Sequence, residues 1–226
     1  MKINYLGHSS FIISGNGHDE QKVTLVTDPF DPKMLGLPYH KQDADIVTCS
    51  HEGHGDHDWY EGIKKVDEKD YFLINTPGEY EIRGVRIFGI KSFHDDKQGK
   101  ERGQNTIFVF DFEEARIAHL GDLGHPLDSE QIEALEGVDI LMVPVGGTFT
   151  IDSRQAVNVI EEIEPKIVIP MHYKVEGMTP AFEKLETLED FLKEAGIDVK
   201  ESEDLKIKSK SDLPQDTTYM PMSRSN

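Results

Sequence analysis

The chain has little cysteine, little positive charge and no long apolar run. Its 226 residues include one cysteine, Cys49, which excludes an internal disulfide framework and fits a reducing compartment. Asp and Glu outnumber Lys and Arg by 43 to 24, and the resulting net charge of -19 disfavours binding to nucleic acid or to an anionic membrane. No apolar run approaches the roughly 20 residues of a bilayer span. We therefore expect no nucleic-acid or membrane partner.

Short alternating segments fill the first 120 residues. They have the period-2 pattern of β-strands and are separated by Gly, Asn and Asp. The predicted strands are 3–6, 11–14, 23–27, 46–49, 72–75, 85–90, 106–112 and 115–120. The first of them begins almost at Met1, without the apolar segment of a signal peptide, so the expected location is the cytoplasm.

Helical spacing alternates with apolar strands in the second half. The predicted helices are 132–135, 156–163 and 185–195, and the predicted strands are 140–145 and 167–171. Asp152 or Ser153 can cap the second helix, and Gly196 can end the third. After Lys206 the pattern fits one or two closing strands or a frayed loop. Strands followed by β–α alternation predict an α/β fold, a four-layer α/β/β/α sandwich formed by a single domain over residues 1–226.

The segment 50–58, Ser-His-Glu-Gly-His-Gly-Asp-His-Asp, has the composition of a metal site. Imidazole and carboxylate are the groups that zinc and similar divalent metals prefer, and two glycines let the loop fold around an ion. A polar surface turn would explain this segment alone. Ligand-type residues also follow several predicted strands directly: Asp28, His51, His94, Asp122 and His172. Loops at strand ends converge on clefts, so we expect these side chains to meet.

On these motifs the chain resembles the metallo-β-lactamase superfamily, and most closely its branch of Zn-dependent hydrolases that includes ascorbate-phosphate lactonase-like proteins. The motifs, in family order, are Thr27-Asp28-Pro29, residues 50–57, Phe93-His94-Asp95, Leu120-Gly121-Asp122 and Met171-His172-Tyr173. The resemblance implies the metallo-β-lactamase fold and two Zn²⁺ ions per chain, with Mn²⁺ or Fe²⁺ as alternatives. The implied ligands are His51, His54 and His94 for one ion, Asp56, His57 and His172 for the other, and Asp122 as the bridge. Asp28 would orient the histidine loop from behind.

The histidine loop departs from the family pattern H-x-H-x-D-H, because this chain has one more residue between the first two histidines. If Gly53 is a looped-out insertion, His51 keeps its role as a ligand. If the loop is aligned from its other end, Glu52 takes that position and a carboxylate shifts the preference toward manganese or iron. We favour the first alternative because glycine adopts the unusual dihedral angles that a bulge requires.

This ligand set predicts a hydrolase. Two divalent ions about 3.5 to 4 Å apart can activate a shared hydroxide and polarise a carbonyl or phosphoryl oxygen. Asp56 is the expected catalytic proton acceptor. The expected substrate is a small, anionic ester, lactone or phosphoester, and the sequence makes no prediction of oligomeric state. Residues predicted to contact the substrate are His8, Arg102, Asn105, His125 and Lys174. The alternative is a catalytically degenerate member that binds a ligand or partner without turnover.

Overall fold

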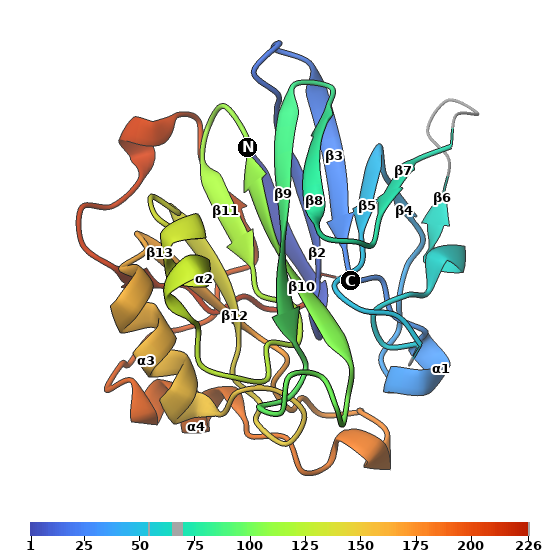
Figure 1. Cartoon of the computed structure of the whole chain (residues 1–226), viewed down its shortest axis with the longest axis vertical. Helices are drawn as coiled ribbons and strands as arrows, with labels where there is room; N and C mark the ends of the chain where they lie inside the picture. Colours follow the sequence, from blue (N-terminus) through green and yellow to red (C-terminus); the bar gives the residue numbers. More distant parts are fainter. Residues whose placement is uncertain (54, 65–69, 226) are drawn as a thin grey trace.

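Two β-sheets pack face to face and share one apolar core (Figure 1). The computed structural model describes residues 1–53, 55–64 and 70–225. The first sheet has the order β14 (Leu205–Lys206), β1 (Lys2–Gly7), β2 (Ser10–Asn16), β3 (Lys22–Thr27), β5 (Ile46–Thr48) and β7 (Phe72–Ile74). The second has the order β15 (Thr218–Tyr219), β13 (Ile167–Met171), β12 (Ile140–Pro144), β11 (Arg116–His119), β10 (Gln104–Asp111), β9 (Val85–Phe93) and β8 (Gly78–Ile82). Every predicted strand is present, with small differences at the ends.

Because of the strand directions, several strands of each sheet end on the same side of that sheet. In the first sheet β3 and β5 run parallel. In the second sheet β11, β12 and β13 are parallel, and β9 has the same direction because β10 is antiparallel to both β9 and β11. The arrowheads of β9 and β11 point to the lower end of the molecule in Figure 1. The loops that follow these strands are therefore neighbours in space.

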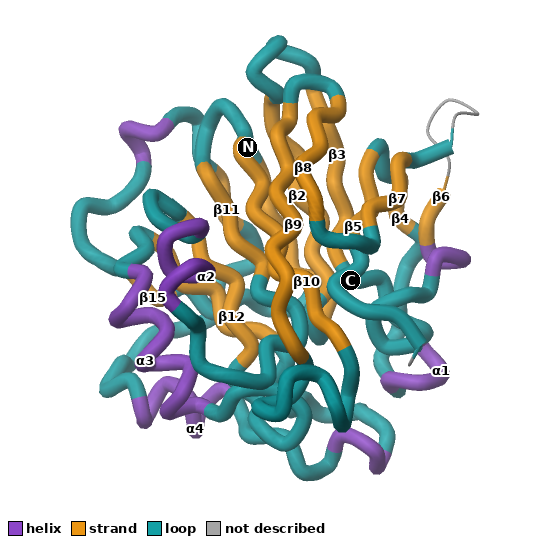
Figure 2. Tube along the Cα trace, in the orientation of Figure 1, coloured by secondary structure: helices purple, strands orange, loops and turns teal. Residues whose placement is uncertain are grey.

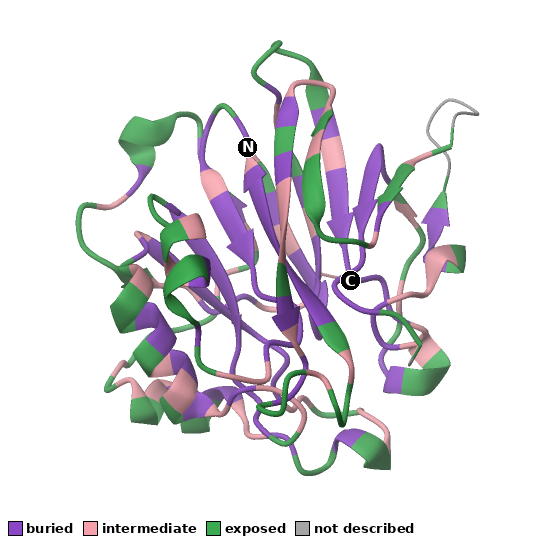
Figure 3. Cartoon of the chain, in the orientation of Figure 1, coloured by how far each residue is buried: buried purple, intermediate pink, exposed green. Residues whose placement is uncertain are grey.

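Three helices cover the outer face of the second sheet and lie together on one side of the molecule (Figure 2). They are α2 (Ser129–Ala134), α3 (Ser153–Ile163) and α4 (Leu188–Glu194). Asp152 caps α3 by accepting a hydrogen bond from the backbone of Gln155, and α3 buries Ala156, Val159 and Ile160. In Figure 3 the central strands are buried, whereas the edge strand β8 is largely exposed.

The outer face of the first sheet has a thinner cover. A separate apolar cluster on this face contains Leu6, Val26, Ala44, Val47 and Ile63. Short elements supply the cover: η1 (Tyr60–Gly62) and a two-stranded sheet of β4 (Gln42–Asp43) and β6 (Ile63–Lys64). The fold is thus the predicted α/β sandwich, with one outer layer reduced to short segments. Among the described residues, no helix has the length and apolarity needed to cross a bilayer.

The C-terminal segment joins both sheets. β14 pairs with β1 in the first sheet, and β15 pairs with β13 in the second. The segment between them contains η3 (Lys210–Asp212). The backbone N–H of Ser225 then donates to the carbonyl of Tyr5 in β1, at 2.7 Å. The segment after Lys206 thus forms one closing strand, β15 on the second sheet, whereas β14 on the first sheet lies just before it.

Candidate metal centre

Asp122 lies at the centre of a buried cluster of histidines from both sheets. It follows β11, and its side chain is 1% exposed. His94, after β9, and His172, after β13, each place Nε2 3.2 Å from Asp122 Oδ2. His57, in the loop after β5, places Nε2 3.3 Å from Oδ1. The strand ends that the sequence singled out therefore converge on one carboxylate.

The structure distinguishes His51 from Glu52. His51 Nε2 lies 3.9 Å from Asp122 Oδ2, and its ring centroid is 4.7 Å from that of His94. The Glu52 side chain is directed away from the cluster, where its carboxylate accepts hydrogen bonds from Tyr60 Oη at 2.8 Å and from an amide nitrogen of Asn75. The predicted ligand His54 lies outside the described residues. The alternative in which Gly53 is the extra residue therefore fits the geometry, and its φ of 107° is one that favours glycine.

Left-handed backbone redirects the chain at three positions in or beside the cluster. His8, Asp28 and His172 each follow a strand and have φ angles of 56°, 40° and 56°. Such angles are uncommon for residues with a side chain, and strained backbone is concentrated at functional sites. The strain is held by backbone contacts between the two sheets, because His172 N donates to His8 O at 2.9 Å. A second such bond runs from the N–H of Thr106 in β10 to Ser50 O, at 2.8 Å.

Asp28 lies behind the histidine loop and fixes the orientation of His57. Its carboxylate accepts hydrogen bonds from Ser50 N and Ser50 Oγ, both at 2.7 Å, and lies 2.9 Å from His57 Nδ1. Since a carboxylate only accepts, the proton of this bond is on Nδ1. In the neutral ring, Nε2 then keeps its lone pair, and this nitrogen faces Asp122.

Several buried atoms of the cluster lack hydrogen bonds, which fits a site built for metal. Within the described part of the chain, Nε2 of His57, Nε2 of His172 and Oδ1 of Asp56 are buried without a hydrogen-bond partner. An unsatisfied buried polar atom costs about 1 to 3 kcal/mol, so such a group calls for an unseen partner. A divalent cation satisfies all of them once His57 Nε2 has lost its proton, and the imidazole and carboxylate set suits zinc.

The protonation states of three cluster residues also suit a cation. Burial, reinforced by neighbouring histidines, holds the pKa of His8 well below its ordinary value and lowers that of His51 to about 3. Both rings are therefore neutral at pH 7, which is the form that binds metal. Burial alone would raise the pKa of Asp122, but the charges of His172 and His57 hold it well below the ordinary range, so Asp122 is ionised.

His57 has the opposite shift, and so does His94, because the hydrogen bond and charge of Asp122 outweigh burial and raise the pKa of His94. Burial would lower the pKa of His57, but the carboxylates of Asp122, Asp56 and Asp28 outweigh that effect and raise the pKa well above its ordinary value. Without a cation His57 therefore retains a second proton. A metal ion must displace this proton, so metal affinity decreases as the pH falls.

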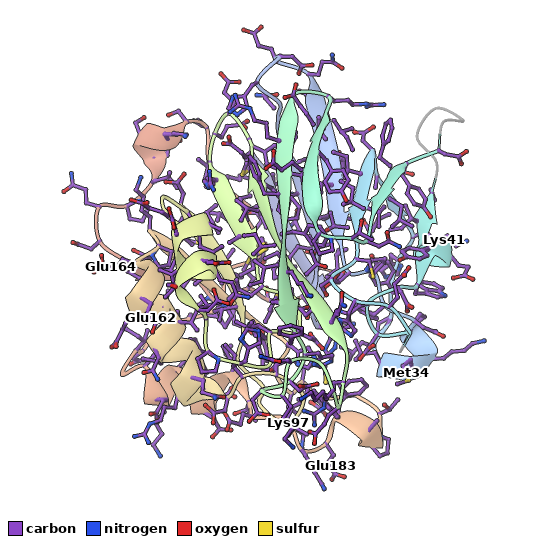
Figure 4. The ribbon with its side chains drawn as sticks, viewed as in Figure 1. Met34, Lys41, Lys97, Glu162, Glu164 and Glu183 are labelled. Carbon is purple, nitrogen blue, oxygen red and sulfur yellow. The ribbon has the colours of Figure 1, made fainter. Side chains whose placement is uncertain are left out.

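A cavity of about 210 Å³ opens onto the cluster. Its lining combines three polar cluster residues and Arg102 with an apolar wall: Met34, Asp56, His94, Arg102, Asp122, Phe149, Ala181 and Phe182. Met34 belongs to α1 (Pro32–Leu35), and Phe182 ends η2 (Pro180–Phe182). Figure 4 labels Met34 at the lower right of the molecule, beside α1, and Lys97 and Glu183 at its lower end. No sequence pattern indicated Met34, Phe149 or Phe182, because the wall comes from loops that are far apart in the chain.

Arg102 is the cation among the residues that line this cavity, and its loop is held by hydrogen bonds to Asp95. The Asp95 carboxylate accepts four backbone hydrogen bonds from the loop 97–102 at 2.7 to 3.0 Å. These bonds outweigh burial and hold the pKa of Asp95 at about 2. The Arg102 guanidinium donates to Thr148 O at 2.9 Å and lies 5.7 Å from the centre of the Phe149 ring. The loop thus places a positive charge beside an aromatic wall.

Asn105 was predicted to contact a substrate, and the structure corrects that interpretation. The side chain is fully buried, and its amide nitrogen donates to Ser92 Oγ at 2.7 Å and to Leu120 O at 2.9 Å. Its oxygen accepts from Asp122 N at 2.9 Å. All of its polar atoms are therefore used, and the residue positions the backbone of Asp122.

His125 and Lys174 also lie outside the cavity lining, contrary to the prediction. His125 bonds to backbone on both sides, with Nε2 accepting from Phe93 N at 3.1 Å and Nδ1 donating to Pro126 O at 2.7 Å. Lys174 Nζ donates to Glu183 O at 3.0 Å. Both side chains stabilise loops. His8 is likewise not in the lining, since it is completely buried behind the cluster.

Known proteins share this fold and its sequence pattern. Residues 2–172 match the family profile of the beta-lactamase superfamily domain. A UPF0173 metal-dependent hydrolase of Staphylothermus marinus is 31% identical over 193 residues, covering 76% of this chain and 82% of the relative. Another, from Methanopyrus kandleri, is 29% identical and covers 88% and 94%.

Solved structures agree with these relatives. A Thermotoga maritima protein described as a Zn-dependent hydrolase of the metallo-beta-lactamase superfamily is 35% identical, with a TM-score of 0.75 and coverage of 98% and 97%. The metallo hydrolase Igni18 of Ignicoccus hospitalis is 20% identical and shares the fold, with a TM-score of 0.65 and coverage of 92% and 99%. With this sheet topology and this cluster of histidines and aspartates, the chain belongs to the metallo-β-lactamase superfamily, among its metal-dependent hydrolases.

Proposed function

We propose that the protein is a binuclear zinc hydrolase that cleaves a small, anionic ester, lactone or phosphoester. The observation that carries this proposal is that one cavity is lined both by Asp56, His94 and Asp122 and by Arg102. A substrate held there would have its reacting bond at the cluster and its charge near the guanidinium.

The proposed ligands are His51, His54 and His94 for one ion, Asp56, His57 and His172 for the other, and Asp122 for both. When bound, the ions would supply Lewis acidity that polarises the substrate oxygen and lowers the pKa of water. Asp56 would accept a proton from the attacking water, since the residue lines the cavity and its buried Oδ1 has no hydrogen-bond partner among the described residues.

The cavity limits the size and chemistry of the substrate. Its volume of about 210 Å³ is below the roughly 300 to 1,000 Å³ of pockets for drug-sized ligands. Met34, Phe149 and Phe182 favour an apolar portion. Arg102 favours a carboxylate or phosphate at the other end, because guanidinium pairs with both groups through two hydrogen bonds. We also propose a cytoplasmic location, on the basis of the single buried cysteine.

Metal content and selectivity test this function. Elemental analysis of the purified protein should find about two zinc ions per chain, and predominance of manganese or iron would contradict the zinc assignment. Hydrolysis is then compared for two esters with the same leaving group, one with a terminal carboxylate on the acyl chain and one with a methyl group there. The wild-type protein should prefer the carboxylated ester, and the corresponding lactones and phosphoesters extend the comparison. A metal-loaded protein that cleaves none of these substrates would support the degenerate, ligand-binding alternative.

A matched pair of variants isolates the role of Arg102. Arg102→Gln should lower kcat/KM for the carboxylated ester by about 10- to 100-fold, because a hydrogen bond to a charged group contributes about 1.5 to 3 kcal/mol. Lys100→Gln removes the same charge from an exposed position of the same loop and should leave the preference intact. If both substitutions lowered kcat/KM for the carboxylated ester equally, the overall charge of the loop, and not Arg102 itself, would determine the preference.

A further inference from the structure

His8 is a buried histidine that the ligand set above leaves without a role. It follows β1 and is 0% exposed. Its ring centroid lies 3.9 Å from that of His172 and 5.1 Å from that of His57. The edge of Phe182 closes the other side, at 5.3 Å between centroids. The ring is therefore part of the cluster and is shielded from the cavity.

Both ring nitrogens of His8 lack a hydrogen-bond partner among the described residues. The nearest carboxylate oxygen is Asp56 Oδ2, 3.9 Å from His8 Nε2, which is too long for a direct hydrogen bond. A buried histidine with a structural role normally donates one ring proton, as His119 does to Ser9 O at 2.7 Å. His8 makes no such contact, so its burial is not explained by the protein alone.

The distances fit shared coordination of one cation. Two ligand atoms that each lie about 2.1 Å from an ion can be at most about 4.2 Å apart. The separation of 3.9 Å between His8 Nε2 and Asp56 Oδ2 is within that limit. One ligand atom from each of His8, His57 and His172 also lies within 4.8 Å of the others, so small movements would bring all three nitrogens to one ion.

The backbone at His8 is fixed at a conformational cost. Its φ of 56° is left-handed, a conformation that is unfavourable for an L-residue other than glycine. The carbonyl of His8 accepts hydrogen bonds from Tyr5 Oη and from His172 N, both at 2.9 Å. These bonds tie the positions of His8 and His172 together, and the strained backbone directs the imidazole into the cluster.

We propose that His8 is a ligand of the second metal ion, through Nε2, together with Asp56, His57 and His172. This ion would then be bound by three imidazoles and a carboxylate, in addition to the bridging Asp122. Such an imidazole-rich set favours zinc, cobalt or iron over manganese. The proposal rests on the proposed metal centre and assigns to the residue after the first strand a role beyond the five motifs.

His8→Asn is the most informative variant. Asparagine adopts left-handed backbone more easily than other residues with a side chain, so the turn is retained. Its amide reaches about as far as the Nδ1 position and cannot replace Nε2. The measurements are zinc affinity by competition with a chromophoric chelator, and the visible absorption of the Co²⁺-substituted protein, which reports the number and type of ligands. Neither readout depends on turnover.

Loss of a residue that only orients a ligand lowers metal affinity about 10- to 100-fold, so loss of a ligand should cost at least tenfold. We expect His8→Asn to weaken one of the two ions by this amount and to change the Co²⁺ spectrum. Asp45→Asn removes a buried carboxylate outside the cluster, where Asp45 pairs with Arg83, and should leave both readouts unchanged. If His8→Asn does not fold, as judged by circular dichroism, His8→Gln is measured in its place.

The outcomes separate the two proposals. A wild-type protein that binds two ions, with a His8 variant of unchanged affinity and spectrum, would overturn the inference and leave the proposed function intact. Equal losses in the His8 and Asp45 variants would also overturn it, since the effect would then be general destabilisation. A wild-type protein that binds no metal would overturn both.

Discussion

Asp28→Asn tests how the protein prepares His57 for metal. The substitution keeps the shape of a side chain that is 1% exposed and replaces one carboxylate oxygen with an NH₂ group. The remaining oxygen can still accept from Ser50 N, and Ser50 Oγ can rotate and accept from the new amide. The N–H at His57 Nδ1 cannot rotate in this way, because the imidazole ring fixes its direction. Either this N–H faces another donor, or its proton moves to Nε2 and blocks the nitrogen that faces Asp122.

The size of the effect follows from the contacts. One hydrogen bond to a charged acceptor is lost, which should lower the free energy of unfolding by about 1.5 to 3 kcal/mol. Partners that orient a metal-binding histidine contribute about 10- to 100-fold in affinity, or roughly 1.4 to 2.8 kcal/mol. The expected losses of folding stability and of metal affinity are similar in size, because both come from the hydrogen bond between Asp28 and His57.

Zinc competition titrations and urea unfolding measure the two quantities, and Asp45→Asn is the matched control. Asp45 is also buried, at 8% exposure, and its carboxylate pairs with Arg83 and accepts from Thr24 N, away from the cluster. The control should lose stability and keep its zinc affinity. If Asp28→Asn also binds zinc within about twofold of the wild type, the tautomer argument is refuted.

Four further substitutions test other parts of the site. His51→Ala should release metal whereas Glu52→Ala should not, and elemental analysis of the two variants would show the reverse if Glu52 were the ligand. Gly121→Ala should lower the free energy of unfolding by about 2 to 4 kcal/mol, because the residue has a φ of 57° and an added Cβ would overlap the Asn105 side chain; a loss below 1 kcal/mol in a urea titration would contradict this. Since the folded pKa of Asp95 is about 2 and its ordinary value is 3.8, its contribution to stability is present above pH 4 and is lost as the pH falls through 2. Asp95→Asn should therefore unfold with less dependence on pH in this range, and an unchanged pH profile would count against that reasoning.

Much of the fold was predictable because its strands bury alternate or continuous apolar residues. The pattern at 167–171 coincides with β13 (Ile167–Met171), and Asp152 was one of two predicted caps of α3. Helix α2 begins earlier than its apolar spacing indicated, because Asp128 forms a capping box with Gln131. Strands of two residues, such as β4 and β6, are too short to show any period. Their pairing depends on the sheet beneath them.

The residues of the site were predictable where a side chain that can bind metal comes directly after a predicted strand. Histidine and aspartate directly after strands are unusual enough to single out, and the structure brings the described ones together. A lone polar side chain near a strand end is not informative in this way. Asn105 and His125 could equally have faced the cavity, and only the three-dimensional structure shows that backbone groups occupy their polar atoms. No pattern in the sequence indicated which residues form the apolar wall of the cavity.

The two sheets supply different ligands to the same cluster. His51 and His57 come from the first half of the sequence, whereas Asp122 and His172 come from the second. An ion bound as proposed would therefore act as a cross-link between distant parts of the chain, present only in the folded state. Free metal at 100 times its dissociation constant would add about 2.7 kcal/mol to folding by mass action. The melting temperature of this protein would then depend on the metal buffer, and a chelator would act on it as a denaturant.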